Sequence, residues 1–400
     1  MLCETEQLMA SPFRGSLDRV VNIDDLRRLA RRRVPDVIFD YIDGGAEAEI
    51  TLRDNRRSWD DVLFRPRNAV RVPTRDTSTT LFGAELTMPL LLAPVGYGRS
   101  FHPDGEVGVG RAARDAGIGY VLSTFAGYAV EEVAKAAGTL WYQLYLAGGQ
   151  GVAEASIARA WAAGCRVLAV TIDTNAPGFR ERDIRNGSAQ LIGGTLRDKL
   201  PYVANILRHP RWFAGYLSDR KDVMFYPNVV VPGAGPMRAR DVRGNLLTSV
   251  LAWEDLTWIR KCWPGTIVMK GVITGDDARR AMDEGATGVV VSNHGGRQLD
   301  TCYPTVRALP EVVRAVNGRA EVLVDGGIRR GADIAKAVAM GAKAVLIGRA
   351  YAYGLAGAGR LGVARAIEIL RTDLERTLAL LGCASTRELD GSYVDVPKNW

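Results

Sequence analysis

One pattern recurs along the chain: an Ala-rich helical stretch, then a glycine, then a short unbroken run of apolar residues. It is clearest in RAARDAGIGYVLS (111–123), ARAWAAGCRVLAVT (158–171), ARRAMDEGATGVVVS (278–292) and IAKAVAMGAKAVLIG (334–348). In each copy the glycine stands where a helix would end in a left-handed residue. The apolar run after it shows no alternation with polar residues, which is typical of a strand buried on both faces.

Apolar runs of this kind predict eight strands, most of them separated by about the length of a helix. The runs are 89–95, 119–124, 139–146, 166–173, 266–271, 287–293, 321–325 and 344–348. Eight strands alternating with helices predict an α/β protein with a (β/α)8 TIM barrel. A doubly wound open sheet is the structural alternative, because it is built from the same units.

Two long segments lie outside this repeat. Residues 21–88 contain the helix-like stretch IDDLRRLARRR and predict an N-terminal helical extension. Residues 187–252 form an insertion after the fourth strand, which in a barrel belongs to the active-site face. We therefore expect a flexible N-terminus over 1–20, a single barrel domain over 21–385 and a C-terminal tail over 386–400.

Composition and charge are those of a soluble globular protein. The 400 residues are 47% apolar and 24% charged, with 52 basic and 45 acidic residues and a net charge of +7. This mild excess suits an anionic substrate or an anionic membrane surface, and we expect no nucleic acid partner. The insertion holds nine Lys or Arg against four Asp, and it carries most of the excess. The five arginines within 27–33 are interpreted as a solvated helix face.

Several classes of protein are not supported by the sequence. Five scattered cysteines show no metal-type spacing, so we expect free thiols in a reducing compartment and no metal site. The N-terminus lacks a secretory pattern, and no run of 18 apolar residues occurs. GVGRAA (108–113) and GAGRLG (357–362) lie within helical text rather than after a strand, which argues against a nicotinamide site. The expected location is the cytoplasm, with peripheral contact to the inner face of the membrane left open.

His294 stands at the end of a predicted strand, followed by two glycines and Arg297 in SNHGGRQLD (292–300). Barrel enzymes carry their catalytic residues at the carboxyl ends of strands. The glycines let a ligand approach the backbone, and the arginine can grip a carboxylate through two parallel hydrogen bonds. The pattern favours a catalytic histidine over a buried structural one.

Polar residues also follow other predicted strands. They are Gln143 and Tyr145 in WYQLY, Thr171 and Asp173 in TID, Arg180 in GFRERD, Lys270 in VMKG, Asp325, Gly326, Gly327 and Arg329 in VDGGIRRG, and Gly348 and Arg349 in LIGR. The loops after strands seven and eight of a barrel commonly bind a phosphate, and the last two segments supply N–H groups and arginines for one. These strand ends together predict a single functional rim.

The chain resembles the family of FMN-dependent 2-hydroxy-acid dehydrogenases and oxidases. The resemblance covers about residues 21–385 and rests on FDYIDGGAE, MKGV, SNHGGRQLD, VDGGIRRGADI and LIGRA. Members include glycolate oxidase, L-lactate dehydrogenase and mandelate dehydrogenase. The resemblance implies a (β/α)8 barrel, FMN as cofactor, a homotetramer, and oxidation of a small anionic (S)-2-hydroxy acid, such as L-lactate or mandelate, to the 2-oxo acid.

The resemblance also implies a role for each site residue. His294 would be the base, held by Asp173, while Tyr41, Tyr145, Arg180 and Arg297 would bind the substrate beneath Phe125. Lys270 would stabilise negative charge at the N1–C2 edge of the flavin. The other FMN contacts would be Pro94, Val95 and Gly96 beneath the ring, Ser123, Gln143, Thr171 and Ser292 at the ring and ribityl chain, Asp325 at the ribityl chain, and Gly326, Gly327, Arg329, Gly348 and Arg349 at the phosphate.

The electron acceptor is the least determined part of the function. Gly96 and Phe125 stand where glycolate oxidase has Ala and Trp, and the insertion is similar to that of membrane-associated L-lactate dehydrogenases. The insertion and Gly96 together favour a quinone or another carrier over oxygen, while Phe125 leaves the size of the substrate open. The basic, aromatic-rich stretch 196–217 is compatible with a membrane-surface element or with a lid on the barrel. The alternatives are an oxygen-using oxidase or monooxygenase, a tailoring oxidase of a natural-product pathway, and a non-redox phosphate-binding barrel.

Overall fold

Eight parallel strands close into a barrel in the computed structural model, which describes residues 17–188, 191, 196–219, 225–242, 244–245, 250–398 and 400. The barrel strands are β4 (Leu90–Leu92), β5 (Gly119–Ser123), β6 (Leu140–Leu144), β7 (Val167–Thr171), β10 (Thr266–Val272), β11 (Gly288–Val291), β12 (Glu321–Val324) and β13 (Ala344–Ile347). Because β13 pairs with β4, the sheet has no edge. All eight predicted strands and the TIM barrel are confirmed, and the open sheet is excluded.

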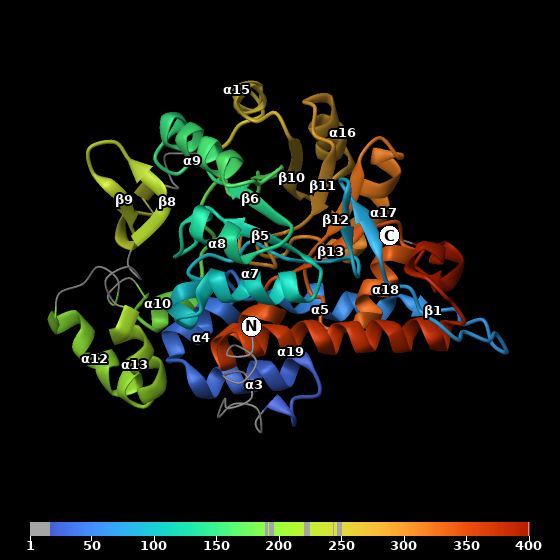
Figure 1. Ribbon diagram of the computed structural model, residues 1–400, viewed down its shortest axis with the longest axis horizontal. Helices are drawn as coiled ribbons and strands as arrows, with labels where there is room; N and C mark the ends of the chain where they lie inside the picture. The colour runs from blue at the N-terminus through green and yellow to red at the C-terminus, as the bar shows by residue number, and fades with distance from the viewer. Residues whose placement is uncertain are drawn as a thin grey trace.

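A helix follows each barrel strand and packs outside it (Figure 1). These helices are α7 (Gly105–Asp115), α8 (Val130–Ala136), α9 (Gln150–Ala162), α15 (Asp255–Cys262), α16 (Gly275–Asp283), α17 (Thr305–Val316), α18 (Gly331–Ala339) and α19 (Arg349–Leu381), with the short α6 (Gly98–Phe101) before α7. The glycines of the recurring pattern have positive φ angles, which confirms their expected role at helix ends. They are Gly117, Gly164, Gly285 and Gly341.

The barrel interior is packed, so it offers a site only at one end. Alternate strand residues, such as Val121, Val290 and Leu323, fill the interior and are fully buried. A hairpin of β2 (Thr79–Leu81) and β3 (Ala84–Leu86) covers the amino end of the barrel. Its Phe82 ring lies 5.5 Å from the ring of Trp141. The carboxyl end is left for ligands, as expected for this architecture.

The N-terminal extension is helical, as predicted. It consists of α3 (Ile23–Arg33), α4 (Asp36–Asp43) and α5 (Ile50–Asp61). Helix α3 runs along α19. At the start of α5, the carboxylate of Asp300 accepts hydrogen bonds from the N–H groups of Ile50 and Thr51. After residue 385 the chain forms η2 (Thr386–Glu388), η3 (Gly391–Tyr393) and β14 (Val394–Asp395), and β14 pairs with β1 (Leu63–Phe64).

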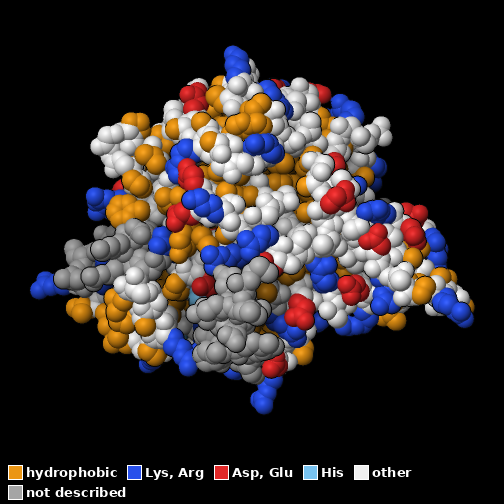
Figure 2. All heavy atoms as spheres, in the orientation of Figure 1, with side chains coloured by type: hydrophobic (Ala, Val, Ile, Leu, Met, Phe, Trp, Pro, Cys, Tyr) orange, Lys and Arg blue, Asp and Glu red, His pale blue; other side chains and the backbone are white. Residues whose placement is uncertain are grey.

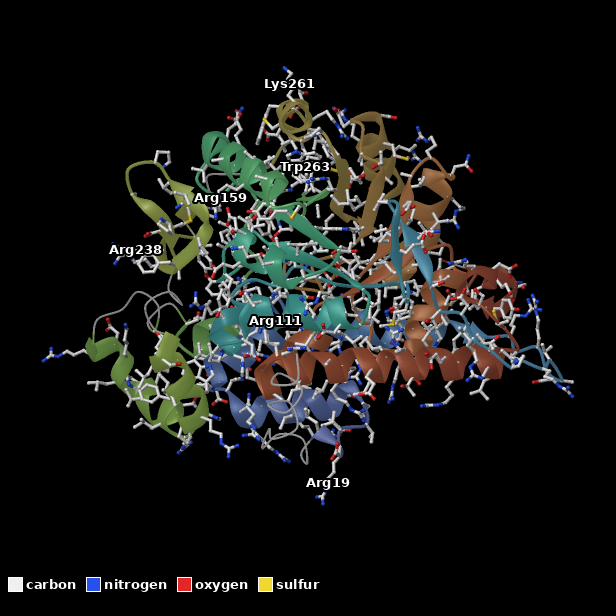
Figure 3. All side chains as sticks on the ribbon, in the orientation of Figure 1. Arg19, Arg111, Arg159, Arg238, Lys261 and Trp263 are labelled. Atoms are coloured by element: carbon white, nitrogen blue, oxygen red, sulfur yellow. The ribbon has the colours of Figure 1, made fainter. Side chains whose placement is uncertain are left out.

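The insertion forms a separate layer beside the carboxyl end of the barrel, at the left of Figure 1. Its described elements are α12 (Leu196–Leu207), α13 (Pro210–Asp219), β8 (Phe225–Val231), β9 (Gly235–Arg238) and η1 (Ala239–Asp241), and α10 (Glu181–Arg185) directly precedes it. Arg159 joins the β8–β9 hairpin to the barrel, since it pairs with Glu131 and donates to the Pro227 carbonyl at 2.7 Å (Figure 3). Residues 1–16, within the expected flexible N-terminus, lie outside the described residues.

Candidate active site

A large cavity of about 1230 Å³ opens at the carboxyl ends of the barrel strands. All but three of the predicted site residues line it. The other three lie directly behind its wall: Gln143 donates to the Thr171 hydroxyl at 2.9 Å, Ser292 accepts from Lys270 at 2.9 Å, and Asp173 contacts His294. The rim inferred from six separate strand ends is therefore one continuous site.

His294 and Asp173 form a hydrogen-bonded pair at this rim. The Nδ1 atom of His294 lies 2.9 Å from Oδ1 of Asp173, and its Nε2 atom lies 3.3 Å from the Tyr145 hydroxyl. Burial opposes charge on Asp173, but His294 and Lys270 outweigh it and hold the pKa of this carboxyl below its usual value. A charged Asp173 fixes the proton on Nδ1, so that Nε2 can accept another from a ligand.

The backbone at His294 adopts the left-handed conformation, with a φ angle of 57°. This is uncommon for a residue other than glycine and requires support from its surroundings. The support comes from Asn293, which exchanges two side-chain hydrogen bonds with Asn55 of α5, at 2.8 and 2.9 Å. Asn293 also accepts from the Gly296 N–H at 3.1 Å. The sequence interpretation missed both asparagines, although Asn293 adjoins the histidine.

Two arginines give the substrate end of the cavity its positive charge. Arg297 lies over the Tyr41 ring and donates through Nη1 to the carbonyl oxygens of Tyr41 and Gly44. Burial, and then repulsion from Arg180, lower the pKa of the Arg297 guanidinium. Arg180 forms an ion pair with Asp183 at 3.0 Å. Asp183 lines the cavity and was not identified from the sequence. The close positive charges suit an anionic ligand.

Aromatic rings form the wall beside these arginines. Phe125 stacks on Tyr145 with ring centroids 5.3 Å apart, and Tyr41 and Tyr97 meet edge to face at 5.1 Å. Tyr226, on β8 of the insertion, contacts both Phe125 and Tyr97. Burial raises the pKa values of the Tyr41, Tyr97 and Tyr145 hydroxyls, which keeps them protonated and able to donate hydrogen bonds. Tyr226 could not be found by sequence because its position depends on the folding of the insertion.

The opposite half of the cavity suits FMN. Lys270 is buried and pairs with Oδ2 of Asp325 at 3.0 Å, and although burial disfavours its charge, Asp325 and Asp173 raise its pKa. The other oxygen of Asp325, Oδ1, is buried and has no partner among the described residues, so it can accept from a ligand hydroxyl. Gly326 and Gly327 line the cavity with positive φ angles, next to Arg329. The free carboxylate oxygen fits the predicted ribityl contact, and the glycines and Arg329 fit the predicted phosphate contact.

The guanidinium of Arg349 is already engaged with the protein. It donates to the carbonyl oxygens of Ile42, Asp43, Gly44 and Gly295 at 2.7–3.2 Å. Burial and the neighbouring Arg297 lower its pKa to about 10. This side chain therefore joins the FDYIDGG segment to the loop after His294, and its predicted contact with the phosphate remains a prediction.

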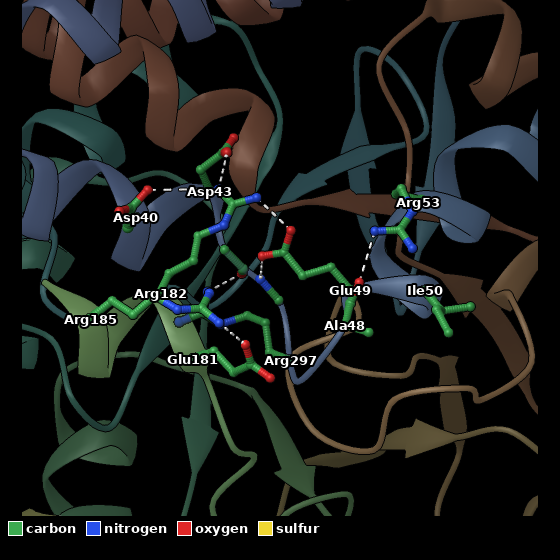
Figure 4. Close-up of polar contacts among 12 residues, drawn as sticks. Asp40, Asp43, Ala48, Glu49, Ile50, Arg53, Glu181, Arg182, Arg185 and Arg297 are labelled. Atoms are coloured by element: carbon green, nitrogen blue, oxygen red, sulfur yellow. Dashed lines mark hydrogen bonds and ion pairs between the residues drawn. The ribbon is translucent and has the colours of Figure 1, made fainter.

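Asp43 and Arg182 connect the N-terminal extension to α10, the helix that precedes the insertion (Figure 4). Arg182 of α10 donates to Asp43 at 2.9 Å and to Glu49, and Asp43 also accepts from Arg27 and from the Tyr353 hydroxyl. Burial disfavours the charged carboxylate, but the hydrogen bonds from Arg27 and Tyr353 hold the pKa of Asp43 well below its usual value. The network therefore ties α3, α4, α10 and α19 together behind Tyr41.

Replacing Asp43 with Asn should destabilise the protein by about 3 kcal/mol at pH 7, because two arginines lose a buried partner. A carboxyl with a lowered folded-state pKa stabilises above its unfolded pKa of about 4 and loses that contribution below it. The melting-temperature difference from the unmodified protein should therefore shrink as the pH falls below about 4. The matched control is Asp24→Asn, which breaks an exposed pair with Arg56. Equal effects of the two substitutions would contradict the role of Asp43.

No helix among the described residues is long and apolar enough to cross a membrane, and no group of His, Cys, Asp and Glu within them could hold a metal ion.

Comparison with known proteins gives a consistent result. The family model described as FMN-dependent dehydrogenase matches residues 30–396. A putative L-lactate dehydrogenase of Mycobacterium tuberculosis is 40% identical, covering 94% of this chain and 90% of the relative. An L-lactate oxidase of Nostoc is 38% identical, covering 94% and 98%. Among solved structures, a monotopic membrane protein, (S)-mandelate dehydrogenase, superposes with a TM-score of 0.87 at 35% identity, covering 95% of this chain and 100% of that one.

Proposed function

Since the chain belongs to the family of FMN-dependent dehydrogenases, which includes 2-hydroxy-acid dehydrogenases and oxidases, we propose that it oxidises an (S)-2-hydroxy acid to the 2-oxo acid with His294 as the base. The observation that carries the assignment of the base is the contact of 2.9 Å between His294 and Asp173 at the rim of the cavity. The two arginines beside this pair supply the charge that a carboxylate substrate requires.

Each residue then has a definite part in the reaction. Arg180 and Arg297 bind the substrate carboxylate, and the protonated Tyr41 and Tyr145 donate hydrogen bonds to the substrate oxygens. Nε2 of His294 accepts the hydroxyl or Cα proton of the substrate, and Asp173 stabilises the imidazolium that forms. FMN, when bound, supplies the two-electron acceptor, and Lys270, Asp325 and Arg329 are among the residues that would hold it.

The aromatic wall supports a substrate with a large apolar side chain. Phe125 and Tyr97 line the cavity, and the buried ring of Tyr226 contacts both of them. A methyl group would leave the two lining rings mostly uncovered. An aryl group would bury more apolar surface there and could stack on these rings. We therefore propose a mandelate-like acid rather than L-lactate as the preferred substrate.

Anaerobic bleaching of the bound flavin tests this function. The purified protein is expected to be yellow and to lose its absorbance on addition of an (S)-2-hydroxy acid without oxygen. In a panel of acids, (S)-mandelate should bleach at least ~10-fold more efficiently than L-lactate, because an apolar pocket separates side chains of different size by that order. Absence of bleaching with the whole panel would favour the non-redox phosphate-binding alternative. Equal bleaching efficiency with (S)-mandelate and L-lactate would contradict only the proposed preference for a mandelate-like acid.

We also propose that the insertion contacts an anionic membrane surface and that the acceptor is a quinone or similar carrier. Apolar side chains gather over α12 and α13 (Figure 2), where Leu200, Leu207 and Leu217 are 67%, 58% and 45% exposed. Basic residues, including Arg208, stand among them. A solvent-exposed apolar patch flanked by cations is typical of membrane-surface helices. The similarity of the fold to that of (S)-mandelate dehydrogenase, a monotopic membrane protein, supports the same interpretation.

Sedimentation with vesicles tests the membrane contact. The protein should pellet with anionic phospholipid vesicles at low salt and dissociate at high salt, because salt screens surface charge. The double substitution Leu207→Gln and Leu217→Gln should abolish pelleting. The substitution Leu63→Gln, at a residue that is 60% exposed on β1, should not. If the unmodified protein stays in solution at low salt, the insertion acts as a lid instead.

The acceptor is tested separately. After anaerobic reduction, dissolved oxygen should restore the flavin colour slowly and a soluble quinone should restore it quickly. Rapid formation of stoichiometric peroxide would identify an oxygen-using oxidase, whatever the vesicles show.

A further inference from the structure

The cavity extends well beyond the predicted substrate and FMN residues. The cavity has a volume of about 1230 Å³ and is also lined by residues of α4, α12 and α13 that were not predicted as site residues. The additional space lies between α4 and the helices α12 and α13. We call it the apolar vestibule, and its lining includes Ile38, Leu200, Val203, Ile206, Phe213 and Tyr216.

The walls of the apolar vestibule are held together by specific contacts. Asn205 of α12 and Asp36 of α4 exchange two hydrogen bonds, at 2.8 and 2.9 Å. The Trp212 indole donates to the Ser100 carbonyl oxygen at 2.8 Å, and its ring stacks on Tyr216. Helix α12 is thus fixed to α4, and α13 is fixed to α6. The walls of the apolar vestibule are therefore held in place by hydrogen bonds between different elements of the fold.

The apolar vestibule connects the protein surface to the catalytic rim. Leu200 and Val203 of α12 are 67% and 39% exposed at the surface. Ile206, Phe213 and Tyr216 are half-buried. The same cavity is lined at its other end by Tyr41 and His294. A ligand entering from the apolar surface therefore has a route to the reacting end.

The chemistry of this lining decides what kind of ligand it suits. The six residues that define the apolar vestibule are uncharged, and among the lining residues of α12 and α13 only Lys199 carries a charge. Most of this surface therefore offers no partner to a carboxylate, whose burial without partners is costly. An alkyl or isoprenoid chain would gain free energy for each methylene buried there. The proposed reaction also needs a second substrate that removes two electrons and two protons in each turnover.

We propose that the apolar vestibule binds the hydrocarbon tail of a lipophilic quinone, with the quinone ring at the Tyr41 end of the cavity. This inference rests on the proposed function. In each turnover the hydroxy acid loses two electrons and two protons and becomes the 2-oxo acid. The quinone gains them and leaves as the quinol. The surface mouth at Leu200 lets the tail enter from the apolar patch.

Filling the apolar vestibule tests the proposal. In the holoenzyme, Ile206→Trp should lower the rate at which a decyl-substituted benzoquinone reoxidises the reduced enzyme by at least ~10-fold. The reason is that the decyl chain can no longer be buried in the apolar vestibule. The rate with the benzoquinone lacking the decyl chain, and the rate of flavin bleaching by the hydroxy acid, should stay unchanged. The control is Leu217→Trp, on α13 outside the cavity lining. Val203→Trp, at the mouth, is a second variant in case the first does not fold.

A binding measurement separates this inference from the proposed function. A dimethoxybenzene carrying a decyl chain cannot accept electrons, and calorimetry should show that it binds the unmodified holoenzyme and not Ile206→Trp. This result does not depend on whether a hydroxy acid bleaches the flavin. Equal losses with both quinones, or unchanged binding of the decyl compound, would overturn the proposal. A change in preference between mandelate and lactate would overturn it too, because the space would then belong to the substrate side chain.

Discussion

Replacing His294 with Ala is expected to slow bleaching of the flavin by a 2-hydroxy acid by at least ~10²-fold, the usual range for loss of a general base. Nε2 of His294 faces the cavity, and its other ring nitrogen is held by Asp173 at 2.9 Å. No other histidine lines this cavity, so within the described residues no second imidazole can take over. The loss should appear in the limiting rate at saturating substrate, measured anaerobically by stopped-flow absorbance.

The FMN content should survive this substitution, because the predicted phosphate cradle lies at Gly326, Gly327 and Arg329. The matched control is His102→Ala, since His102 contacts Asp104 outside the cavity lining. Its bleaching rate should match that of the unmodified enzyme. If the His294 variant bleached at a near-normal rate while retaining FMN, His294 would not be the base.

Substituting Arg297 with Lys should weaken binding of the hydroxy acid by about 10²-fold, the effect of losing a hydrogen bond to a charged group worth about 1.5–3 kcal/mol. Arg297 uses Nη1 for the carbonyl oxygens of Tyr41 and Gly44, and its planar head also stacks on the Tyr41 ring. A lysine cannot hold the backbone and grip a carboxylate at the same time. The half-saturation concentration for bleaching should therefore rise while FMN stays bound.

Two comparisons check that the carboxylate is what Arg297 recognises. The amide of the same hydroxy acid should be a poor substrate for the unmodified enzyme, and Arg297→Lys should change its turnover little. Arg307→Lys is the matched control, because Arg307 stacks on the exposed ring of Tyr303 and does not line the cavity. Turnover of acid and amide at equal rates would contradict carboxylate recognition by Arg297.

The barrel and its rim could be predicted from the chain because both depend on local patterns. A strand buried on both faces needs an unbroken apolar run, and a helix that ends in a left-handed residue favours glycine there. In a parallel barrel every strand ends on the same face, so polar residues at strand ends are brought together by the topology. This is why the predicted rim residues, from Tyr145 to Arg349, meet around one cavity.

The partners of these side chains could not be predicted in the same way, since they come from segments distant in sequence. Asn55 supports the loop at His294 from 238 residues away, and Tyr226 reaches Phe125 only because the insertion folds back. Arg349 follows the segment LIG, which was predicted to bind a phosphate, but its guanidinium donates hydrogen bonds to four carbonyl oxygens.

The apolar vestibule likewise exists only because α12 and α13 are fixed against α4 and Ser100. The sequence by itself determined the barrel, the order of its strands and the residue types at the rim, because short-range periodicity encodes them. Only the tertiary structure decided which groups remain available to a ligand. A hydrogen bond or a cavity depends on the simultaneous positions of several segments, and no local pattern records that.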